Sequence, residues 1–230
     1  MALVTPRLPL NFFKPSRPAV EVPPPGLSPA AFDEYFRAAA GPLAGTDEAG
    51  RGPLAGPLVA AAVILAPGGD YPEVGDSKKL SPRAREKAFG LIEARAVSWA
   101  WAAVEAEEVD RLNPLRAALL AMTRAVAGLT PPPALVLADG NFAPPTPMPA
   151  RAVVRGDGLS LSIGAASIMA KVIRDRLMLE WHARYPDYGF DRHKGYGTAA
   201  HLAALRHHGP SPCHRLSFKR VKPGPDGFEF

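Results

Sequence analysis

The sequence predicts an α/β fold in which a mixed β-sheet is flanked by helices, with a helical extension toward the C-terminus. Short apolar runs bounded by Gly or Pro alternate with segments of helical spacing, which favours β-α-β units. Strand-like segments come first, and helix-like segments dominate the last third of the chain. With 230 residues, 47% hydrophobic and 21% charged, the chain can bury one core of ordinary size. We therefore expect one domain over residues 41–220.

The N-terminal residues are expected to form an arm and a short helix, residues 1–40. Residues 1–26 are rich in proline and end in Pro-Pro-Pro-Gly. Proline lacks a backbone donor, which excludes regular helix and central strand, so we interpret this segment as extended. Ser28 followed by Pro29 is typical of an N-cap and first helical residue, and predicts a helix to about residue 40. Residues 221–230 are expected to be a tail.

Five segments are predicted as strands. The first two, residues 43–47 and 58–65, are short apolar runs bounded by Gly and Pro. Residues 97–104 have the aromatic composition that favours a strand. Residues 134–138 form a compact apolar run, and residues 150–154 are expected to be the last strand.

The helices are predicted from start signals and from periodicity. A Ser-Pro pair starts a helix over residues 81–94, and a second helical region is interrupted at Asn113-Pro114 and ends at Gly128. The clearest helix covers residues 162–184, because Ala166, Met169, Ile173 and Leu177 recur at helical spacing. Thr198 caps a final helix that ends near Gly209.

Composition bears on the compartment and on the partner. No apolar run approaches the roughly 20 residues that cross a bilayer, and residues 1–13 lack the pattern of a signal peptide. The one cysteine, Cys213, excludes an internal disulfide framework and suits a reducing cytoplasm, although a cysteine-poor secreted protein would look the same. We expect a cytoplasmic protein that does not associate with membranes.

Positive charge is concentrated in one part of the chain. The net charge is +5, and residues 151–220 contain twelve Lys or Arg against five Asp or Glu, as well as all six histidines. This distribution favours a polyanionic partner, and a solvated basic face is the alternative.

The densest chemical signal is the acidic pair Asp47-Glu48 before a glycine-rich turn. Carboxylates that leave a buried strand are costly unless they are paired or bind metal, and the alternative is a solvated acidic pair. Neighbouring side chains of a strand point to opposite faces, so convergence on one ion requires a bend at Glu48 or indirect ligation. Gly50 and Gly52 allow a ligand to approach the backbone, and Arg51 can either form a fork onto phosphate or stack against a sugar or base.

Two further acids are candidates for the same site. Asp139 ends a predicted strand, where ligands of α/β sheets gather, although an ordinary Asp-Gly turn is the alternative. Asp157 lies between Gly156 and Gly158 in a turn before the long helix, where the glycines permit a ligand to approach closely, and a helix-start or turn residue without a ligand is the alternative. Asp175 lies mid-helix, where we expect an ion pair. A cluster of carboxylates selects Mg²⁺ or Mn²⁺ rather than zinc, and two such ions can promote attack of water on a phosphodiester.

Other polar segments suggest contacts with a nucleic acid. Ser77, Lys78 and Lys79 precede a helix and are suited to phosphate, although lysine pairs are often only solvated surface. Tyr196 lies in a basic, glycine-flanked loop and either stacks on a sugar or base or covers a core edge. The histidines show no zinc pattern, so we expect them to contact phosphate or solvent.

Read in order, these segments resemble ribonuclease HII, the bacterial type 2 ribonuclease H. The matching stretches span about residues 43–220: Asp-Glu-Ala-Gly-Arg-Gly-Pro-Leu-Ala-Gly-Pro at 47–57, Asp-Ser-Lys-Lys-Leu at 76–80, Asp-Gly-Asn at 139–141, Gly-Asp at 156–157, Ala-Ala-Ser-Ile-Met-Ala-Lys-Val-Ile-Arg-Asp-Arg at 165–176, His-Lys-Gly-Tyr-Gly-Thr at 193–198 and His-Arg-Leu-Ser-Phe at 214–218. Several long motifs in one order make the resemblance specific.

The resemblance implies a fold, an activity and a set of site residues. The fold would be RNase H-like with a C-terminal helical extension. The activity would be endonucleolytic cleavage of RNA in RNA-DNA hybrids and at single ribonucleotides in duplex DNA, with two metal ions, giving 5′-phosphate and 3′-hydroxyl ends. It further implies that the catalytic and metal-binding residues are Asp47, Glu48, Asp139 and Asp157. The residues that read the ribose would be Gly50, Arg51, Gly52 and Tyr196. Separately from the resemblance, we expect a monomer.

Two other classes of function are weighed against this one. A non-catalytic nucleic-acid-binding protein could keep the fold and the basic surface, but the presence of all four acids argues against it. A nuclease or recombinase of the same fold could act on DNA alone, and a duplex with one ribonucleotide distinguishes it from an enzyme that requires the 2′-hydroxyl.

Overall fold

The sheet has five strands and mixed pairing. The computed structural model of the chain describes residues 23–72, 74, 80–221, 223–224 and 227–228. The strand order is β3-β2-β1-β4-β5. The first three strands pair antiparallel, and β1, β4 and β5 pair parallel. The strands are β1 (Leu43–Ala49), β2 (Leu58–Ile64), β3 (Ser98–Val104), β4 (Leu135–Asp139) and β5 (Ala150–Val153).

All five predicted strands are confirmed, but the predicted end of the first strand is wrong, and this error concerns the position of Glu48. The first predicted strand ends at residue 47, whereas β1 continues to Ala49. The reason is that β2 is long enough to pair with all of residues 45–49. Glu48 therefore lies within a strand and not in the turn that follows it.

The predicted helices are also confirmed. Side chains cap four of them where the sequence predicts a helix start: Ser28, Ser81, Asn113 and Thr198 each accept a hydrogen bond from the first helical turn. Asn113, at φ 73°, separates two helices. The helices are α1 (Pro29–Ala40), α2 (Pro82–Arg95), α3 (Ala106–Leu112), α4 (Pro114–Ala127), α6 (Leu161–Arg184) and α8 (Ala199–His208).

Several short elements were not predicted. They are α5 (Gly156–Leu159), η1 (Pro186–Tyr188), α7 (Phe190–His193) and the strands β6 (Pro223–Gly224) and β7 (Gly227–Phe228), which pair antiparallel. A helix of one turn is too short to show hydrophobic periodicity, so only its flanking glycines could indicate a break.

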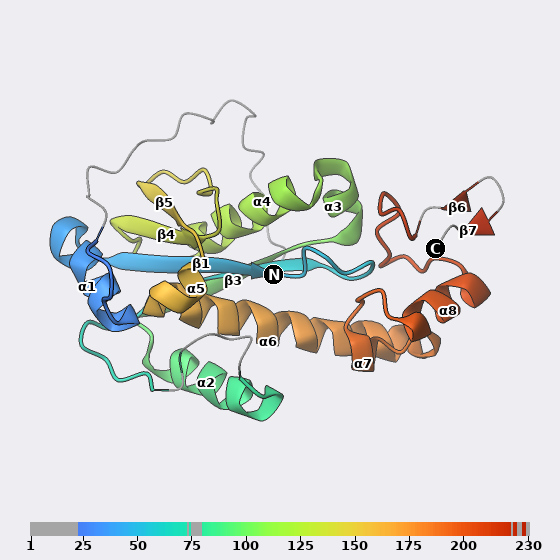
Figure 1. Ribbon diagram of the computed structural model, residues 1–230, viewed down its shortest axis with the longest axis horizontal. Helices are drawn as coiled ribbons and strands as arrows, with labels where there is room; N and C mark the ends of the chain where they lie inside the picture. The colour runs from blue at the N-terminus through green and yellow to red at the C-terminus, as the bar shows by residue number, and fades with distance from the viewer. Residues whose placement is uncertain (1–22, 73, 75–79, 222, 225–226, 229–230) are drawn as a thin grey trace.

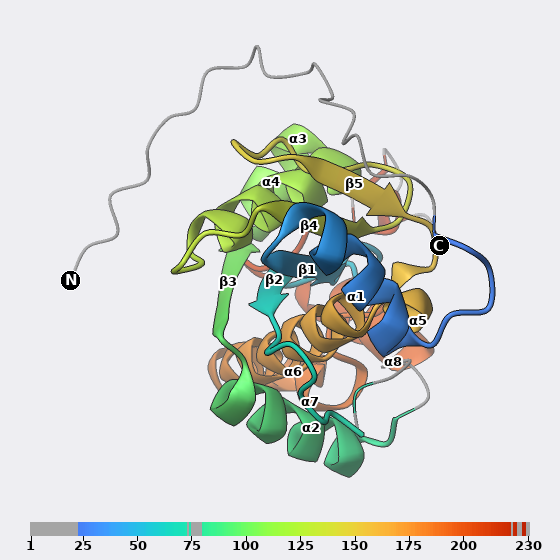
Figure 2. The same ribbon diagram turned by 90° about the vertical axis from the view of Figure 1, so that its left-hand side faces the viewer.

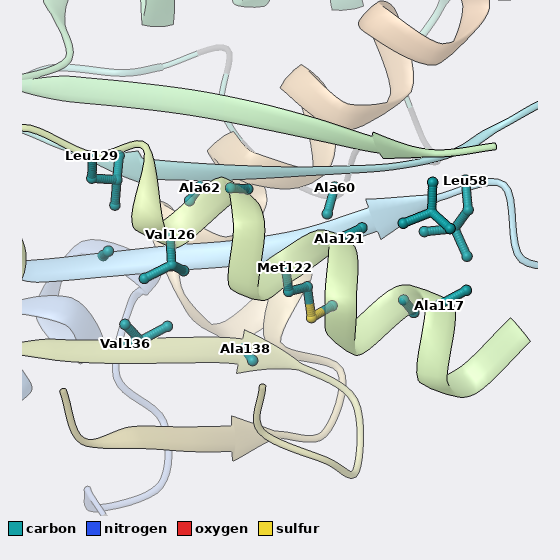
Figure 3. Packing of buried hydrophobic residues seen from close by; sticks show 14 of the residues in the cluster. Leu58, Ala60, Ala62, Ala117, Ala121, Met122, Val126, Leu129, Val136 and Ala138 are labelled. Atoms are coloured by element: carbon teal, nitrogen blue, oxygen red, sulfur yellow. The ribbon is translucent and has the colours of Figure 1, made fainter. Parts of the chain in front are cut away.

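Helices cover both faces of the sheet, with α3 and α4 on one face and α2 and α6 on the other (Figure 1). Alternate residues of β2 divide between these faces: Leu58, Ala60 and Ala62 pack toward α4, and Val59, Ala61 and Val63 pack toward α6. Figure 3 shows Ala121 of α4 near Ala60, with Met122 and Val126 on the side of Val136 and Ala138 of β4. Burying one such large apolar side chain contributes roughly 1.5–3 kcal/mol.

More residues of the long helix α6 are buried than the apolar stripe predicted from the sequence. Ala166, Met169 and Ile173 are buried as expected, and Leu177 is partly buried. In addition, every residue of 162–170 is buried, because the sheet covers one side of this half of the helix and neighbouring helices cover others. This half of α6 is therefore an interior element.

The C-terminal extension forms its own apolar cluster beyond the end of the sheet (Figure 1). It joins the far end of α6 to η1, α7, α8 and the β1-β2 connection. Its buried members are Leu54, Ala55, Met178, Tyr188, Phe190, Leu205, Cys213 and Val221. No helix in the described part of the chain has the length and apolarity needed to span a membrane.

Candidate active site

Asp47 is a buried carboxylate on the central strand β1. It accepts a hydrogen bond from the Glu48 backbone N–H at 2.7 Å and forms another with the Ser167 side chain of α6. Burial raises the pKa of Asp47 well above its ordinary value, and the charges of Glu48 and Asp139 raise it further. A buried group with two acidic neighbours is suited to binding a cation.

Glu48 lies beside Asp47 and pairs with the loop that follows. Arg51 Nη1 donates to Glu48 Oε1 at 3.3 Å. Burial raises the pKa of Glu48, Arg51 acts in the opposite direction, and the charge of Asp139 raises the pKa again. The side chains of neighbouring strand residues point in alternate directions. Even so, the charge of Asp139 raises the pKa of both Asp47 and Glu48, so both carboxylates lie near Asp139.

Asp139 joins the end of β4 to the start of α5. Its Oδ1 accepts the backbone N–H of Gly156 at 2.6 Å and that of Asp157 at 3.4 Å. Since β4 runs parallel to β1, the carboxyl ends of both strands meet at one edge of the sheet. The predicted placement of Asp139 at such an edge agrees with this geometry.

Asp157 is largely buried in the first turn of α5, a one-turn helix that precedes α6. Its flanking glycines differ in purpose. A Cβ on Gly156 would lie 2.6 Å from Ile163 Cδ1, so this glycine serves packing and not ligand approach. A Cβ on Gly158 would have no neighbour within 4 Å.

The four acids offer only oxygen ligands, which suits Mg²⁺ or Mn²⁺. Burial of like charges without a cation is unfavourable, as the raised pKa values of Asp47 and Glu48 indicate. Among the described residues, however, no group of three or more His, Cys, Asp or Glu side chains is arranged so that it could hold a metal ion as it stands. The charges of Asp47, Glu48 and Asp139 act on one another, and the Asp157 N–H reaches Asp139, so the four acids are neighbours at one edge of the sheet.

Two buried arginines fix the loop after Glu48. Arg215 donates to the carbonyl oxygens of Gly50 at 2.6 Å and Arg51 at 3.0 Å, and Arg174 donates to that of Pro57 at 3.0 Å. Burial lowers the pKa of Arg215 to about 9, with the charge of Arg174 as the next cause. The arginines hold the backbone that we expect to read a ribose.

The glycines of this loop have separate roles. Gly50 has φ 101°, and a Cβ there would lie 2.2 Å from Arg174 Nε, so glycine is required for the fold and not for ligand approach. A Cβ on Gly52 would meet nothing within 4 Å, which leaves the space that ligand approach needs.

The structure places Tyr196 beside the same arginines. Arg174 Nη1 donates to the Lys194 carbonyl at 3.0 Å, and its guanidinium lies 5.9 Å from the Tyr196 ring centroid. The Leu54 N–H donates to the Gly195 carbonyl at 2.8 Å, which joins the two loops directly. Tyr196 is 46% exposed, so much of this residue is open to solvent.

The expectation for the histidines is wrong for two of them. His201 and His214 are buried, and their Nε2 atoms lie 3.0 Å apart. Burial is the main cause that lowers the pKa of each to about 4, so both are neutral in the folded chain at pH 7. His201 Nδ1 lies 3.0 Å from the Tyr196 carbonyl, so this pair supports the Tyr196 loop. The spacing of His201 from Leu205, one helical turn along α8, is a signal of burial that the sequence contained.

The other residues singled out in the sequence are as follows in the structure. Ser77, Lys78 and Lys79 lie outside the described residues. Asp175 forms the expected ion pair, with Lys171 Nζ at 2.7 Å. His207 and His208 are exposed.

Comparison with known proteins identifies relatives that match most of the chain. The sequence model of the family described as Ribonuclease HII matches residues 44–221. Ribonuclease HII of Dechloromonas aromatica (strain RCB) is 57% identical over 181 residues, which cover 79% of this chain and 92% of that protein. The crystal structure of ribonuclease H2 from Pyrococcus horikoshii OT3 has a TM-score of 0.65 at 25% identity and covers 77% of this chain and 93% of that chain. Bst-RNase HIII in complex with Mn²⁺ shares the fold, with a TM-score of 0.60 at 18% identity over 77% of this chain and 67% of that chain.

Proposed function

This chain belongs to the ribonuclease HII family of metal-dependent endoribonucleases, and we propose that it cuts both the RNA strand of RNA-DNA hybrids and single ribonucleotides embedded in duplex DNA. The proposal rests on one observation. The acidic edge, formed by Asp47, Glu48, Asp139 and Asp157, lies next to two loops that hydrogen bonds from buried arginines hold in place. Asp47 and Glu48 lead directly into the loop of Gly50, which Arg174 joins to the Tyr196 loop.

The acids would hold two divalent cations, Mg²⁺ or Mn²⁺. Asp47, Glu48, Asp139 and Asp157 supply the oxygen ligands. When bound, the ions supply Lewis acidity that lowers the pKa of water and neutralises charge on the phosphate. Arg51 holds Glu48 in the absence of substrate, and its half-exposed guanidinium can transfer to a phosphate oxygen as the carboxylate turns inward.

The two loops would select the substrate. The 2′-hydroxyl distinguishes RNA from DNA at a given sugar, and backbone groups around Gly52 are open to it. The exposed Tyr196 ring can pack against the same ribose. Ser77, Lys78 and Lys79 complete the proposed substrate contacts through phosphate. We further propose a cytoplasmic monomer that acts on hybrids and ribonucleotide-containing duplexes.

The test is product mapping on a DNA duplex with one embedded ribonucleotide, beside an all-DNA duplex and an RNA-DNA hybrid. We expect one cut at the ribonucleotide, 5′-phosphate and 3′-hydroxyl ends, no cut in the all-DNA strand, and loss of cleavage in EDTA. Cutting of the all-DNA duplex would indicate a DNA nuclease, and binding without any cut in Mg²⁺ or Mn²⁺ would indicate a binding protein. Either result would overturn the proposal.

A further inference from the structure

Helix α1 precedes the residues that match the family, 44–221, yet it is packed into the body of the molecule. Phe36 is buried in an apolar cluster with residues of β1, β4, β5 and α6: Leu43, Leu135, Leu137, Val153 and Ile163. Both views show α1 beside α5 at the start of α6 (Figures 1 and 2). The segment is thus attached at the point where α5 meets α6.

A buried carboxylate makes the polar part of this attachment. Asp33 of α1 is 2% exposed. Its Oδ1 accepts the Ser160 hydroxyl at 2.5 Å, and its Oδ2 accepts the Ser162 backbone N–H at 2.7 Å and the Ser162 hydroxyl at 2.6 Å. A negative charge at the start of a helix is also favoured by the helix dipole.

Burial of a carboxylate is costly, and this one binds residues that are more than 120 positions away in the sequence. Burial raises the pKa of Asp33, and the hydrogen bonds from Ser160 and Ser162 lower it. Leucine or phenylalanine could fill such space without this cost. The carboxylate therefore contributes a specific geometry at the start of α6 and not only burial.

The serines that Asp33 holds are directly linked to the acidic edge. Ser160 ends α5, where its N–H donates to the Gly156 carbonyl at 2.8 Å, and it caps α6 through the Ile163 N–H at 3.2 Å. The Gly156 N–H in turn donates to Asp139. Displacement of Ser160 would move the single helical turn that carries Asp157.

We propose that Asp33 is a positioning residue for Asp157, through Ser160 and Ser162, and that α1 is part of the catalytic unit. The inference rests on the proposed function, because it assumes that Asp157 helps to bind metal. Loss of the Asp33 carboxylate would leave the substrate loops untouched and would weaken ion binding, since these loops are fixed by Arg174 and Arg215 instead.

The test compares Asp33→Ala and Asp33→Asn with Glu34→Gln. Glu34 is the next residue of α1, and its side chain is 57% exposed beside Arg37, so it is a matched control. Two quantities are measured: Mn²⁺ affinity by calorimetry without substrate, and the Mg²⁺ concentration for half-maximal cleavage. For Asp33→Ala we expect Mn²⁺ affinity to fall about 3- to 10-fold, near the low end of effects seen for residues that orient metal ligands. The KM for the duplex should not change.

Rescue by Asn and a double-mutant cycle separate positioning from folding. Asn keeps one acceptor oxygen, so Asp33→Asn should recover part of the affinity. In a Ser160→Ala/Ser162→Ala background, Asp33→Ala should have a smaller further effect than in the wild type, because both hydroxyl partners are gone and only the backbone N–H of residue 162 remains. If Asp33→Ala is too unstable, Asp33→Asn at lower temperature provides the same comparison.

Equal Mn²⁺ affinity in the wild type and in a folded Asp33 variant would overturn the inference. So would a loss that persists in full in the double-serine background. Failure of the proposed function is distinct, because the wild type and Glu34→Gln would then neither bind Mn²⁺ nor cut a ribonucleotide-containing strand.

Discussion

Asp139 has two functions that a single substitution can separate. Its Oδ1 organises α5 through Gly156 and Asp157, and its charge acts on Asp47 and Glu48. An amide oxygen can accept the same backbone hydrogen bonds, so Asp139→Asn should keep the fold. It removes a ligand charge, and the loss of about 3 kcal/mol of transition-state stabilisation corresponds to about 100-fold slower cleavage.

The measurement for Asp139→Asn is single-turnover cleavage in Mg²⁺, with duplex binding measured in EDTA. Binding should be unchanged. Asp175→Asn is the control, because it removes a partly buried ion pair with Lys171 on α6 and none of the four acids. Normal cleavage by Asp139→Asn would show that the acidic edge is assigned wrongly.

Arg215 illustrates why a positive charge can be needed inside the protein. Its guanidinium donates in several directions to the carbonyls of Gly50, Arg51 and Gly56. A lysine ammonium cannot reproduce this planar fork. We expect Arg215→Lys to lower the free energy of unfolding by about 1–3 kcal/mol and to slow cleavage at a single ribonucleotide. Exposed Arg184→Lys should do neither, and an unchanged cleavage rate in Arg215→Lys would mean that the loop does not depend on this fork.

At the scale of elements, β1 and α6 meet at Gly45. A Cβ there would lie 2.1 Å from the backbone carbon of Ser162 and 2.3 Å from the Ile163 nitrogen. Backbone cannot yield as a flexible side chain would, so Gly45→Ala should separate the two elements and lower the free energy of unfolding by about 1–3 kcal/mol. Because Asp47 follows two residues later on β1, cleavage should also slow.

A control for this prediction lies on α2. Gly90 is exposed in the helix interior, and a Cβ there would meet nothing within 4 Å. Gly90→Ala should therefore raise the free energy of unfolding by about 0.5–1 kcal/mol. Chemical denaturation of both variants gives the comparison, and equal effects of the same sign would refute the packing argument.

Helices and strands whose ends are marked by nearby residues can be predicted from the sequence. Contacts between elements that are far apart in the sequence cannot. Ser28-Pro29 and Asn113-Pro114 fix helix starts through groups within a few residues, so the sequence alone indicates them. Asp139 was predictable because strand ends of α/β sheets converge. The role of Asp33 depends on serines more than 120 positions away, and no periodicity reports such a contact.

The same limit applies to the glycines and histidines of the site. Gly50 and Gly156 looked like ligand-approach positions, but Arg174 and Ile163 occupy the space beside them. His201 and His214 looked like surface residues because their partner is visible only after the C-terminal extension folds. Residue type and spacing predicted the acidic edge, while tertiary packing decided which neighbours serve structure.

At the scale of the whole molecule, two buried histidines of the C-terminal extension, His201 and His214, make the free energy of unfolding depend on pH. Their pKa values are lowered to about 4 when folded, against 6.5 for an ordinary histidine. The unfolded chain therefore binds more protons between pH 6.5 and pH 4, and folding stability due to the pair is complete above pH 6.5 and is lost as the pH falls. The expected loss is on the order of 3 kcal/mol between pH 7 and pH 5.

Buried acids act in the opposite direction, so a comparison is needed to isolate the histidines. The raised pKa values of Asp33, Asp47 and Glu48 favour the folded state as the pH falls. His201→Gln can keep the contact with His214 but cannot take up a proton. Its free energy of unfolding should be lower than the wild type at pH 7 and should decline less steeply toward pH 5.

The acid response should also reach the substrate loop, because His201 supports the Tyr196 carbonyl. Denaturation curves at several pH values give the stability, and imidazole titration by NMR gives the two pKa values directly. His207→Gln, an exposed change on the same helix, should leave the pH dependence as it is. Imidazoles that titrate near 6.5, or parallel pH profiles for the wild type and His201→Gln, would show that this buried pair does not couple protonation to folding.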